Sequence, residues 1–304
     1  MERFYTLNQY FKKKYNKKVF KISIDAGFTC PGICSYCSSW GSLASYARNL
    51  RIKKFLSLDE RKNYIKNQVY KSLEYFKKKN IENLYIYFQA FSNLFDTYEN
   101  IYEIYKYTLS LYNFLGLIIG TRPDTIDEKK IKIIKDLSND LDLWIEFGLQ
   151  SSNDNTLKLI NRNHTSKDFT DAVNIIKKFD NIKIGTHIIL GLPFETNEDY
   201  INTIKFLNKN NINGIKFHYL YILKDTQMEK FYNETKFHIL NFEEYISSLA
   251  NCIGYLNKDI VIFRLFSDPE PEEILPKYNI PKSKELNILY DYLEKHDIYQ
   301  GKFV

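Results

Sequence analysis

The chain has 304 residues, of which 44% are hydrophobic and 26% charged. These ordinary values exclude a collagen-like, coiled-coil or wholly disordered protein, and the length allows a sizeable core. The 43 Lys and Arg residues exceed the 37 Asp and Glu residues, which gives a net charge of +6. That surplus is compatible with a polyanionic partner but does not require one.

Strand-like and helix-like segments alternate along the first 220 residues. We predict strands at residues 19–24, 84–88, 116–119, 141–149, 182–190 and 215–221, and helices at residues 58–78, 97–112, 127–137, 167–179 and 197–208. The strands are almost continuously apolar, as expected when both faces of a sheet are covered. Five of them are followed by a helix before the next strand, which favours a parallel sheet with crossover helices.

The rhythm predicts an α/β fold with six strand–helix units, an incomplete TIM-like barrel or open sheet, in residues 1–222. Beyond it we expect a helix at 242–256, a strand at 260–265, a proline-rich stretch at 268–281 and a helix at 284–295. Residues 223–304 therefore form a predicted C-terminal α/β extension that packs on the core. No signal peptide or transmembrane run is visible, so we expect a cytoplasmic protein that does not enter membranes.

Three of the four cysteines lie within eight residues, in the loop after the first predicted strand. Cys30, Cys34 and Cys37 have the spacing C-x3-C-x2-C, and thiolates are ligands for iron–sulfur clusters or zinc. Closed sites of either kind normally use four protein ligands. The fourth cysteine, Cys252, lies in an apolar helical segment and is expected to be a core residue. Two interpretations remain: a cluster with one open iron, or a zinc site completed by a residue such as His164.

The cysteine spacing after the first strand of a βα-repeat chain resembles that of the radical S-adenosylmethionine (radical SAM) superfamily. The resemblance implies that Cys30, Cys34 and Cys37 hold a [4Fe–4S] cluster. It also implies that S-adenosylmethionine chelates the fourth iron and is cleaved to a 5′-deoxyadenosyl radical. In the zinc alternative the outside ligand would be His164 or His187, and the protein would be a zinc-stabilised RNA-binding protein.

Later motifs fall at predicted strand ends and strengthen the resemblance. Phe-Gln-Ala ends the second strand and Thr-Arg-Pro-Asp the third, Gly-Leu-Gln-Ser and then Asn-Arg-x-His follow the fourth, and His-x-x-x-Gly-Leu-Pro ends the fifth. In this order they resemble the branch that contains the Elongator catalytic subunit and YhcC-type proteins, from about residue 5 to 264. The three-residue spacer between the first two cysteines is shorter than is usual in the YhcC-type pattern.

The resemblance implies roles for individual residues. Those expected to bind the cofactor are Tyr36, Gln89, Gln150, Arg162, His187 and Gly191. Those expected to bind the substrate are Arg122, Asp124, Glu146, His164 and Lys224. The planar guanidinium of Arg162 suits the methionine carboxylate, and Gly191 permits a close approach to adenine. Each also has a structural alternative: His187, for example, would fit a hydrogen-bonded core histidine.

The same resemblance suggests a tRNA substrate and modification of the wobble uridine, by conversion of 5-carboxymethylaminomethyl-uridine to 5-aminomethyl-uridine. An electron donor such as flavodoxin or ferredoxin is then an expected partner. Lysine-rich clusters at residues 12–14, 17–18, 51–54 and 77–79 could contact phosphates, although a solvated surface explains most of them equally well. The alternative within the superfamily is an enzyme that acts on a small molecule or a protein.

Overall fold

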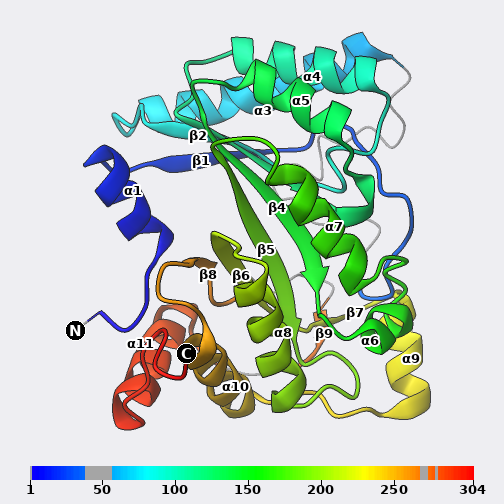
Figure 1. Cartoon of the computed structure of the whole chain (residues 1–304), viewed down its shortest axis with the longest axis vertical. Coiled ribbons are helices and arrows are strands. Elements are labelled where there is room, and N and C mark those ends of the chain that lie inside the picture. Colours follow the sequence, from blue (N-terminus) through cyan, green and yellow to red (C-terminus); the bar gives the residue numbers. More distant parts are fainter. Residues whose placement is uncertain (1, 38–56, 268–272, 278–279) are drawn as a thin grey trace.

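The structure is a computed structural model that describes residues 2–37, 57–267, 273–277 and 280–304. Its main feature is a curled, seven-stranded parallel sheet (Figure 1). In order across the sheet, the strands are β1 (Phe20–Ile24), β2 (Leu84–Phe88), β3 (Gly116–Thr121), β4 (Asp142–Gln150), β5 (Ile182–Leu190), β6 (Gly214–Tyr219) and β8 (Val261–Arg264). Because all neighbours are parallel, the carboxyl ends of the strands share one edge of this half-barrel, called the mouth below.

Crossover helices cover the outer face of the sheet (Figure 1). They are α3 (Leu58–Lys77), α4 (Tyr98–Ser110), α5 (Glu128–Leu137), α7 (Ser166–Ile176) and α8 (Asn197–Lys209), with α10 (Phe242–Tyr255) and α11 (Lys282–Lys295) near the C-terminus. The starts of the helices are encoded locally. The side chains of Ser57, Asp127 and Thr165 each accept a hydrogen bond from a backbone N–H in the first turn of their helix.

The main hydrophobic core lies between the sheet and these outer helices. Phe88 of β2 stacks on Tyr105 of α4 with ring centroids 4.3 Å apart, and Phe147 of β4 meets Phe169 of α7 at 5.7 Å. Burial of a side chain of this size stabilises the fold by about 1.5–3 kcal/mol. Cys252 of α10 is fully buried in the same core, which confirms its predicted structural role.

The inner face of the half-barrel is covered at its amino end by α1 (Leu7–Tyr15). Phe11 packs on Tyr85 with ring centroids 4.9 Å apart, and Tyr10 meets the edge of Trp144 at 5.4 Å. The hydroxyl of Tyr10 also donates to Asp142 Oδ2 at 2.6 Å. The inner face is therefore blocked at the amino ends of the strands, and the mouth is the end at which a ligand can approach it.

The predicted partial barrel is confirmed, and its six strands agree with the structure to within two residues at each end. The seventh strand, β8, comes from the predicted C-terminal extension and pairs in parallel with β6. Among the features that were not predicted are α6 (Asp154–Leu159), α9 (Gln227–Thr235), and an antiparallel pair of β7 (Ile222–Leu223) and β9 (Glu273–Leu275). β9 lies inside the stretch predicted to be only proline-rich.

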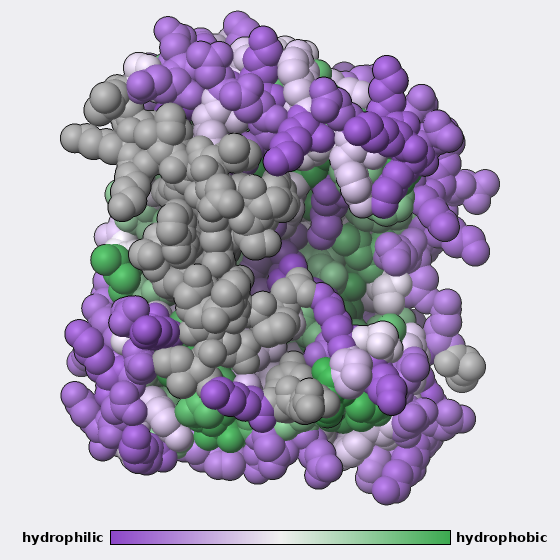
Figure 2. All heavy atoms as spheres, turned by 180° about the vertical axis from the view of Figure 1, so that it is seen from behind, coloured by the Kyte–Doolittle hydropathy of each residue, from purple (hydrophilic) through white to green (hydrophobic). Residues whose placement is uncertain are grey.

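Hydrophilic and hydrophobic residues are unevenly distributed over the surface (Figure 2). Seen from behind, hydrophilic residues dominate the margins of the molecule, and hydrophobic residues show mainly in the recessed middle and lower part (Figure 2). Among the described residues, no helix has both the length and the apolar character needed to cross a bilayer.

Candidate active site at the mouth of the half-barrel

The three clustered cysteines lie in the segment that leaves β1 at the mouth. Cys30 is exposed, with its thiol 3.6 Å from Ser92 Oγ, whereas Cys34 is buried and Cys37 partly buried. The N–H of Cys37 donates to the carbonyl of Cys34 at 3.0 Å, so a tight turn joins these two residues. All three thiols therefore reach the mouth from one short segment.

Arg162 fixes a positive charge beside one of these thiols. Its Nη1 donates to Cys34 Sγ at 3.1 Å, and its Nη2 donates to the carbonyl of Gly148 near the end of β4. Its Nε donates to His164 Nε2 at 3.0 Å. Burial and the charge of Arg162 lower the pKa of His164 to about 4, so the imidazole is neutral and can accept this bond. Because Arg162 is 5% exposed, solvent does little to screen its charge.

A second buried guanidinium, that of Arg122, stands beside the same loop. Its Nε and Nη2 donate to the two carboxylate oxygens of Asp124 at 2.9 and 2.7 Å, and Nη2 also donates to the carbonyl of Arg162. Its Nη1 is buried and has no hydrogen-bond partner among the described residues. That nitrogen lies 4.0 Å from the position that a Cβ would take at Gly32, inside the cysteine loop. A buried donor without a partner is costly, which indicates that a ligand completes this site.

The donor set fits an iron–sulfur cluster. Burial, with a further contribution from the nearby Cys34 and Cys30, raises the pKa of the Cys37 thiol to about 12. Burial also raises the pKa of the Cys30 thiol, so these thiols lose their protons when a metal ion or cluster binds them as thiolates. Thiolate-held clusters with their sulfides are anionic groups, and the two guanidiniums described above supply opposite charge beside the loop. The residues present therefore fit the group that the sequence predicts.

The structure does not favour the zinc alternative. His164 Nε2 lies next to Arg162 Nε and the carbonyl of Gly148, and its Nδ1 faces the carbonyl of Thr165. His187 Nε2 contacts Glu146 Oε2 at 2.7 Å. Within the described residues, no three His, Cys, Asp or Glu side chains are placed around one ion. Each thiolate of a four-iron cluster binds a different iron, so its ligands need not converge on a single point.

Other predicted cofactor residues also lie at the mouth. Gln89 directly follows β2, and Gln150 ends β4 with a left-handed φ of 76°. Gly191 follows β5 with a φ of +91°, a conformation that strains any residue with a side chain, and its N–H donates to Tyr200 Oη at 3.0 Å. Burial raises the pKa of Tyr36, in the cysteine loop, well above its usual value, so its phenol stays neutral. Gln89, Gln150 and Gly191 therefore lie at the mouth on the ends of three different strands, and Tyr36 lies in the cysteine segment itself.

Two predicted residues lie deeper, on the inner face of the half-barrel. Glu146 Oε2 accepts hydrogen bonds from Tyr87 Oη at 2.7 Å and Lys216 Nζ at 2.8 Å, and contacts His187 Nε2 as described above. Lys216 also donates to Tyr87 Oη at 3.0 Å. In contrast, Lys224 is exposed in the turn between β7 and α9, away from the strands that carry these groups.

Tyr87 and Lys216 were not predicted from the sequence, and neither were Lys21 and Arg264, whose charges act on Lys216. A signal was present. Alternate residues of a strand face one side, so polar residues that recur with period two in otherwise apolar strands indicate a polar interior. Lys216 and His218 in β6 follow this pattern.

Comparison with known proteins identifies the family. The sequence model of the radical SAM superfamily matches residues 25–207, which is more than half of the chain. The chain belongs to the radical SAM superfamily. The model of the radical SAM C-terminal domain matches residues 212–295 and so covers β6, β8 and the helices after them. The predicted fold and family are both confirmed.

Relatives of this radical SAM protein are similar over nearly their whole length. Protein MJ0486 of Methanocaldococcus jannaschii is 33% identical over 96% of this chain and 89% of its own. YtqA of Bacillus subtilis is 30% identical over 99% and 93%, respectively, and YhcC of Escherichia coli is 25% identical over 94% and 91%. YhcC is one of the proteins whose motifs the sequence resembles.

A solved structure with the same fold is that of archaeal Elp3 from Methanocaldococcus infernus. It superposes with a TM-score of 0.71 at 18% identity, over 93% of this chain and 64% of the Elp3 chain. At this identity the likeness shows the fold alone. Membership of the radical SAM superfamily implies S-adenosylmethionine and an iron–sulfur cluster, which is the chemistry that the cysteine segment fits.

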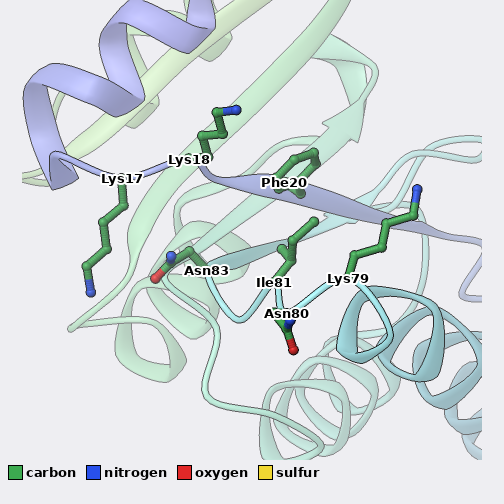
Figure 3. A pocket seen from close by; sticks show the side chains of 7 residues that line it. All are labelled: Lys17, Lys18, Phe20, Lys79, Asn80, Ile81 and Asn83. Carbon is green, nitrogen blue, oxygen red and sulfur yellow. The ribbon is translucent and has the colours of Figure 1, made fainter.

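A surface hollow lies far from this chemistry. It is lined by Lys17, Lys18, Phe20, Lys79, Asn80, Ile81 and Asn83 (Figure 3). These residues precede or begin β1 and β2, so the hollow is at the amino ends of the strands, opposite the mouth. The lysine clusters at 12–14, 17–18 and 77–79 are exposed and flank the same end, and the cluster at 51–54 lies outside the described residues.

Proposed function

We propose that this radical SAM protein modifies the wobble uridine of tRNA, by converting 5-carboxymethylaminomethyl-uridine to 5-aminomethyl-uridine. The radical chemistry is supported by the hydrogen bond from buried Arg162 to Cys34, in a three-cysteine segment at the mouth. The observation that carries the substrate is the ordered series of Elongator-type and YhcC-type motifs, which the structure brings to that same edge of the sheet.

In this proposal Cys30, Cys34 and Cys37 hold a [4Fe–4S] cluster whose fourth iron binds S-adenosylmethionine. When bound, the cluster and S-adenosylmethionine together supply a 5′-deoxyadenosyl radical for hydrogen abstraction. Arg162 stabilises the anionic form of the Cys34 sulfur, and the neutral His164 holds Arg162 in place by accepting from its Nε. Arg122 Nη1, the buried donor without a partner, is available for a carboxylate at the mouth.

Named relatives support an RNA substrate only in part. A tRNA-2-methylthio-N(6)-dimethylallyladenosine synthase from Sulfurihydrogenibium is 33% identical over 29% of this chain. A ribosomal protein uS12 methylthiotransferase from Clostridioides difficile is 31% identical over a segment of similar size, so that segment does not separate RNA from protein substrates. The exposed lysine clusters at the amino end lie opposite the mouth, so they do not position a tRNA there. The tRNA proposal therefore depends on the motif series.

The first experiment tests the radical chemistry. The protein is reconstituted anaerobically with iron and sulfide, and 5′-deoxyadenosine is measured after addition of S-adenosylmethionine and reduced flavodoxin or ferredoxin. We expect a brown protein that forms 5′-deoxyadenosine. Cys34→Ala should lose both properties, whereas the matched variant Cys252→Ala, which alters a buried core thiol, should keep them. A colourless wild-type protein would contradict the proposal.

The second experiment tests the substrate. Transfer RNA from a strain that lacks the gene is digested to nucleosides and analysed by mass spectrometry. We expect 5-aminomethyl-uridine and its derivatives to fall and 5-carboxymethylaminomethyl-uridine to accumulate, and the Cys252→Ala gene to restore the normal profile. An unchanged nucleoside profile in the deletion strain would exclude tRNA as the substrate. If the purified protein still cleaves S-adenosylmethionine, the substrate would then be a small molecule or a protein.

A further inference from the structure

The inner face of the half-barrel holds a group of charged residues at one depth, below the cysteine segment. Glu146 is 1% exposed and Lys216 is 4% exposed. Three side chains, those of Tyr87, His187 and Lys216, lie within 2.8 Å of the single oxygen Oε2 of Glu146. These residues come from β2, β4, β5 and β6, so the group spans the middle of the sheet.

Positive charge exceeds negative charge in this group. Besides Lys216, Lys21 of β1 lies with Nζ 5.6 Å from the ring centroid of Tyr87, and Arg264 of β8 interacts electrostatically with both lysines. In the described part of the chain, the group therefore holds three cations, Lys21, Lys216 and Arg264, beside the one carboxylate of Glu146, which interacts with both lysines. The next carboxylate down β4, Asp142, has its own cations, because Lys14 and Lys183 bind it at 2.6 and 2.7 Å.

The histidines of the group add no compensating charge. Burial and the neighbouring Lys216 lower the pKa of His187 to about 4, so its ring is neutral near pH 7. Burial likewise holds the pKa of His218 well below its usual value. Burial, with a further contribution from Lys21 and Arg264, lowers the pKa of Lys216 to about 8 in spite of Glu146. An anion that enters this group would relieve the surplus of positive charge.

Solvent reaches this face, although helices cover the other. Lys21, His187, His218 and Arg264 are each partly exposed, while the residues between them in the strands are mostly buried. The side chain of His187 is 20% exposed to solvent. His218 Nε2 is a buried polar atom without a hydrogen-bond partner in the described residues, and its ring centroid lies 5.2 Å from that of His187. The group is therefore both reachable and incompletely satisfied.

The group lies directly below the mouth. Glu146 and Gly148 are two residues apart on the same face of β4, which corresponds to about 7 Å. The carbonyl of Gly148 accepts from Arg162, and Arg162 also donates to Cys34. A thin, flexible substituent of the substrate that passes the cysteine segment would therefore need to extend only about 7 Å to reach the cations.

We propose that Lys21, Lys216 and Arg264 bind a carboxylate of the substrate that reaches into the half-barrel from the mouth, with His218 Nε2 as a further contact. This inference rests on the proposed function and deepens it, because the 5-carboxymethylaminomethyl substituent ends in a carboxylate. A backbone phosphodiester is carried by the bulky nucleic acid chain and cannot descend to this depth. Glu146 acts here as a positioning residue that holds Lys216 and Tyr87 in place.

The test compares two anticodon stem–loop RNAs that are identical except at the wobble uridine. One carries 5-carboxymethylaminomethyl-uridine and the other 5-aminomethyl-uridine, and their affinity for the reconstituted holoenzyme is measured by fluorescence anisotropy. We expect the carboxylated RNA to bind about tenfold more tightly, the size of one charged hydrogen bond. Lys21→Met should abolish this preference, because it removes one surplus cation and leaves the hydrogen bonds of Tyr87, His187 and Lys216 to Glu146 in place. Lys21→Arg should retain it, and so should Lys209→Met at the exposed end of α8.

The ratio of the two affinities is an internal control, because a misfolded variant would bind both RNAs more weakly to the same extent. Equal affinity of the wild-type protein for both RNAs, or an equal loss for both in Lys21→Met, would overturn the inference. Equilibrium dialysis of S-adenosylmethionine provides another arm. If Lys21→Met weakens its binding and leaves the RNA preference unchanged, the cations serve the carboxylate of the cofactor and the inference is wrong.

A last arm separates this inference from the proposed function. If the wild-type protein binds neither RNA, the tRNA proposal fails. The unfolding temperature of the holoenzyme is then measured with acetate and, for comparison, with acetamide. Stabilisation by acetate alone that disappears in Lys21→Met but not in Lys209→Met would still support a carboxylate site. No difference between acetate and acetamide would overturn it.

Discussion

Glu146→Gln removes the carboxylate at the centre of the half-barrel while it keeps the shape of the side chain. Burial alone would raise the pKa of Glu146, but Lys216 and His187 hold it well below 4.5, so the native group is charged at neutral pH. In the variant, the buried ammonium of Lys216 loses its counterion. We therefore expect a loss of stability whose size and pH dependence both follow from this pair.

The magnitude follows from the burial of the pair. Removal of one partner of a buried ion pair costs about 3–5 kcal/mol. The amide oxygen of glutamine can still accept from Tyr87, so we expect the lower value, about 3 kcal/mol. With an unfolding entropy of about 2.1 cal/mol/K per residue, a chain of 304 residues loses about 5 °C in unfolding temperature.

The pH dependence comes from Lys216, whose pKa is lowered to about 8 by burial and by the neighbouring cations. A lysine with a lowered native pKa binds fewer protons in the native than in the unfolded state, so stability rises with pH through that interval. Glu146→Gln lowers this pKa further. The deficit should therefore be largest near pH 6 and shrink near pH 9, where the ammonium of Lys216 is mostly deprotonated in both native proteins.

Urea and thermal unfolding at pH 6 and pH 9, followed by circular dichroism, measure both quantities. The matched control is Glu128→Gln, which breaks an ion pair with Lys178 in which both side chains are more than half exposed. Such pairs contribute about 0–1 kcal/mol, so this variant should change little. A deficit below about 1 °C for Glu146→Gln at pH 6, or one that grows towards pH 9, would refute the reasoning.

Three further predictions concern other parts of the molecule. A Cβ at Gly148 would lie 2.9 Å from Gln150 Nε2 and 3.1 Å from Arg162 Nη2, so the ends of both side chains would have to shift by a few tenths of an ångström. Gly148→Ala should therefore fold normally but bind S-adenosylmethionine about tenfold more weakly in equilibrium dialysis, and unchanged binding would contradict the assigned site. Asp142→Asn removes the charge that two lysines bind and should speed hydrogen exchange in α1, with α8 as the internal control. Burial raises the pKa of Glu195 to about 7, so its contribution to stability is lost as the pH rises from about 5 to 7. Glu195→Gln should therefore be about 3 kcal/mol more stable than wild type at pH 8 and within about 1 kcal/mol of it at pH 5 in urea titrations, and the reverse order would contradict this assignment.

The strands were predictable from the sequence because a parallel sheet covered by helices needs continuous apolar segments. β2 and β5 were predicted with their observed bounds for this reason. The place of β8 in the main sheet was not predictable, since a local pattern does not say which edge a strand pairs with. β9 was missed because prolines dominate its surroundings, and only its antiparallel contact with β7 makes it a strand.

The candidate site was predictable to the extent that its residues stand in sequence motifs. Cys34, Arg162 and Gln150 were predicted in this way, and the structure brings their segments to one edge of the sheet. The contact between the guanidinium of Arg162 and the thiol of Cys34 could not be predicted, because the two residues are 128 positions apart in the sequence. Lys216 was missed for a different reason: a lysine in a strand suggests a solvent-facing position, and only the closed amino end of the half-barrel turns that face into an interior.

The two ends of the chain are tied to each other, and this has a consequence for biosynthesis. The N–H of Tyr5 donates to Gln300 Oε1 at 2.8 Å, the N–H of Gln300 donates to the carbonyl of Arg3, and the N–H of Ile262 donates to the carbonyl of Tyr5. The first helix thus leaves the ribosome long before the residues that fix it have been made. Its docking depends on contacts between the extremes of the sequence, which form slowly. We expect nascent chains that stop short of residue 300 to hold an open half-barrel, so the interior closes only once residue 300 has been made and has left the ribosome.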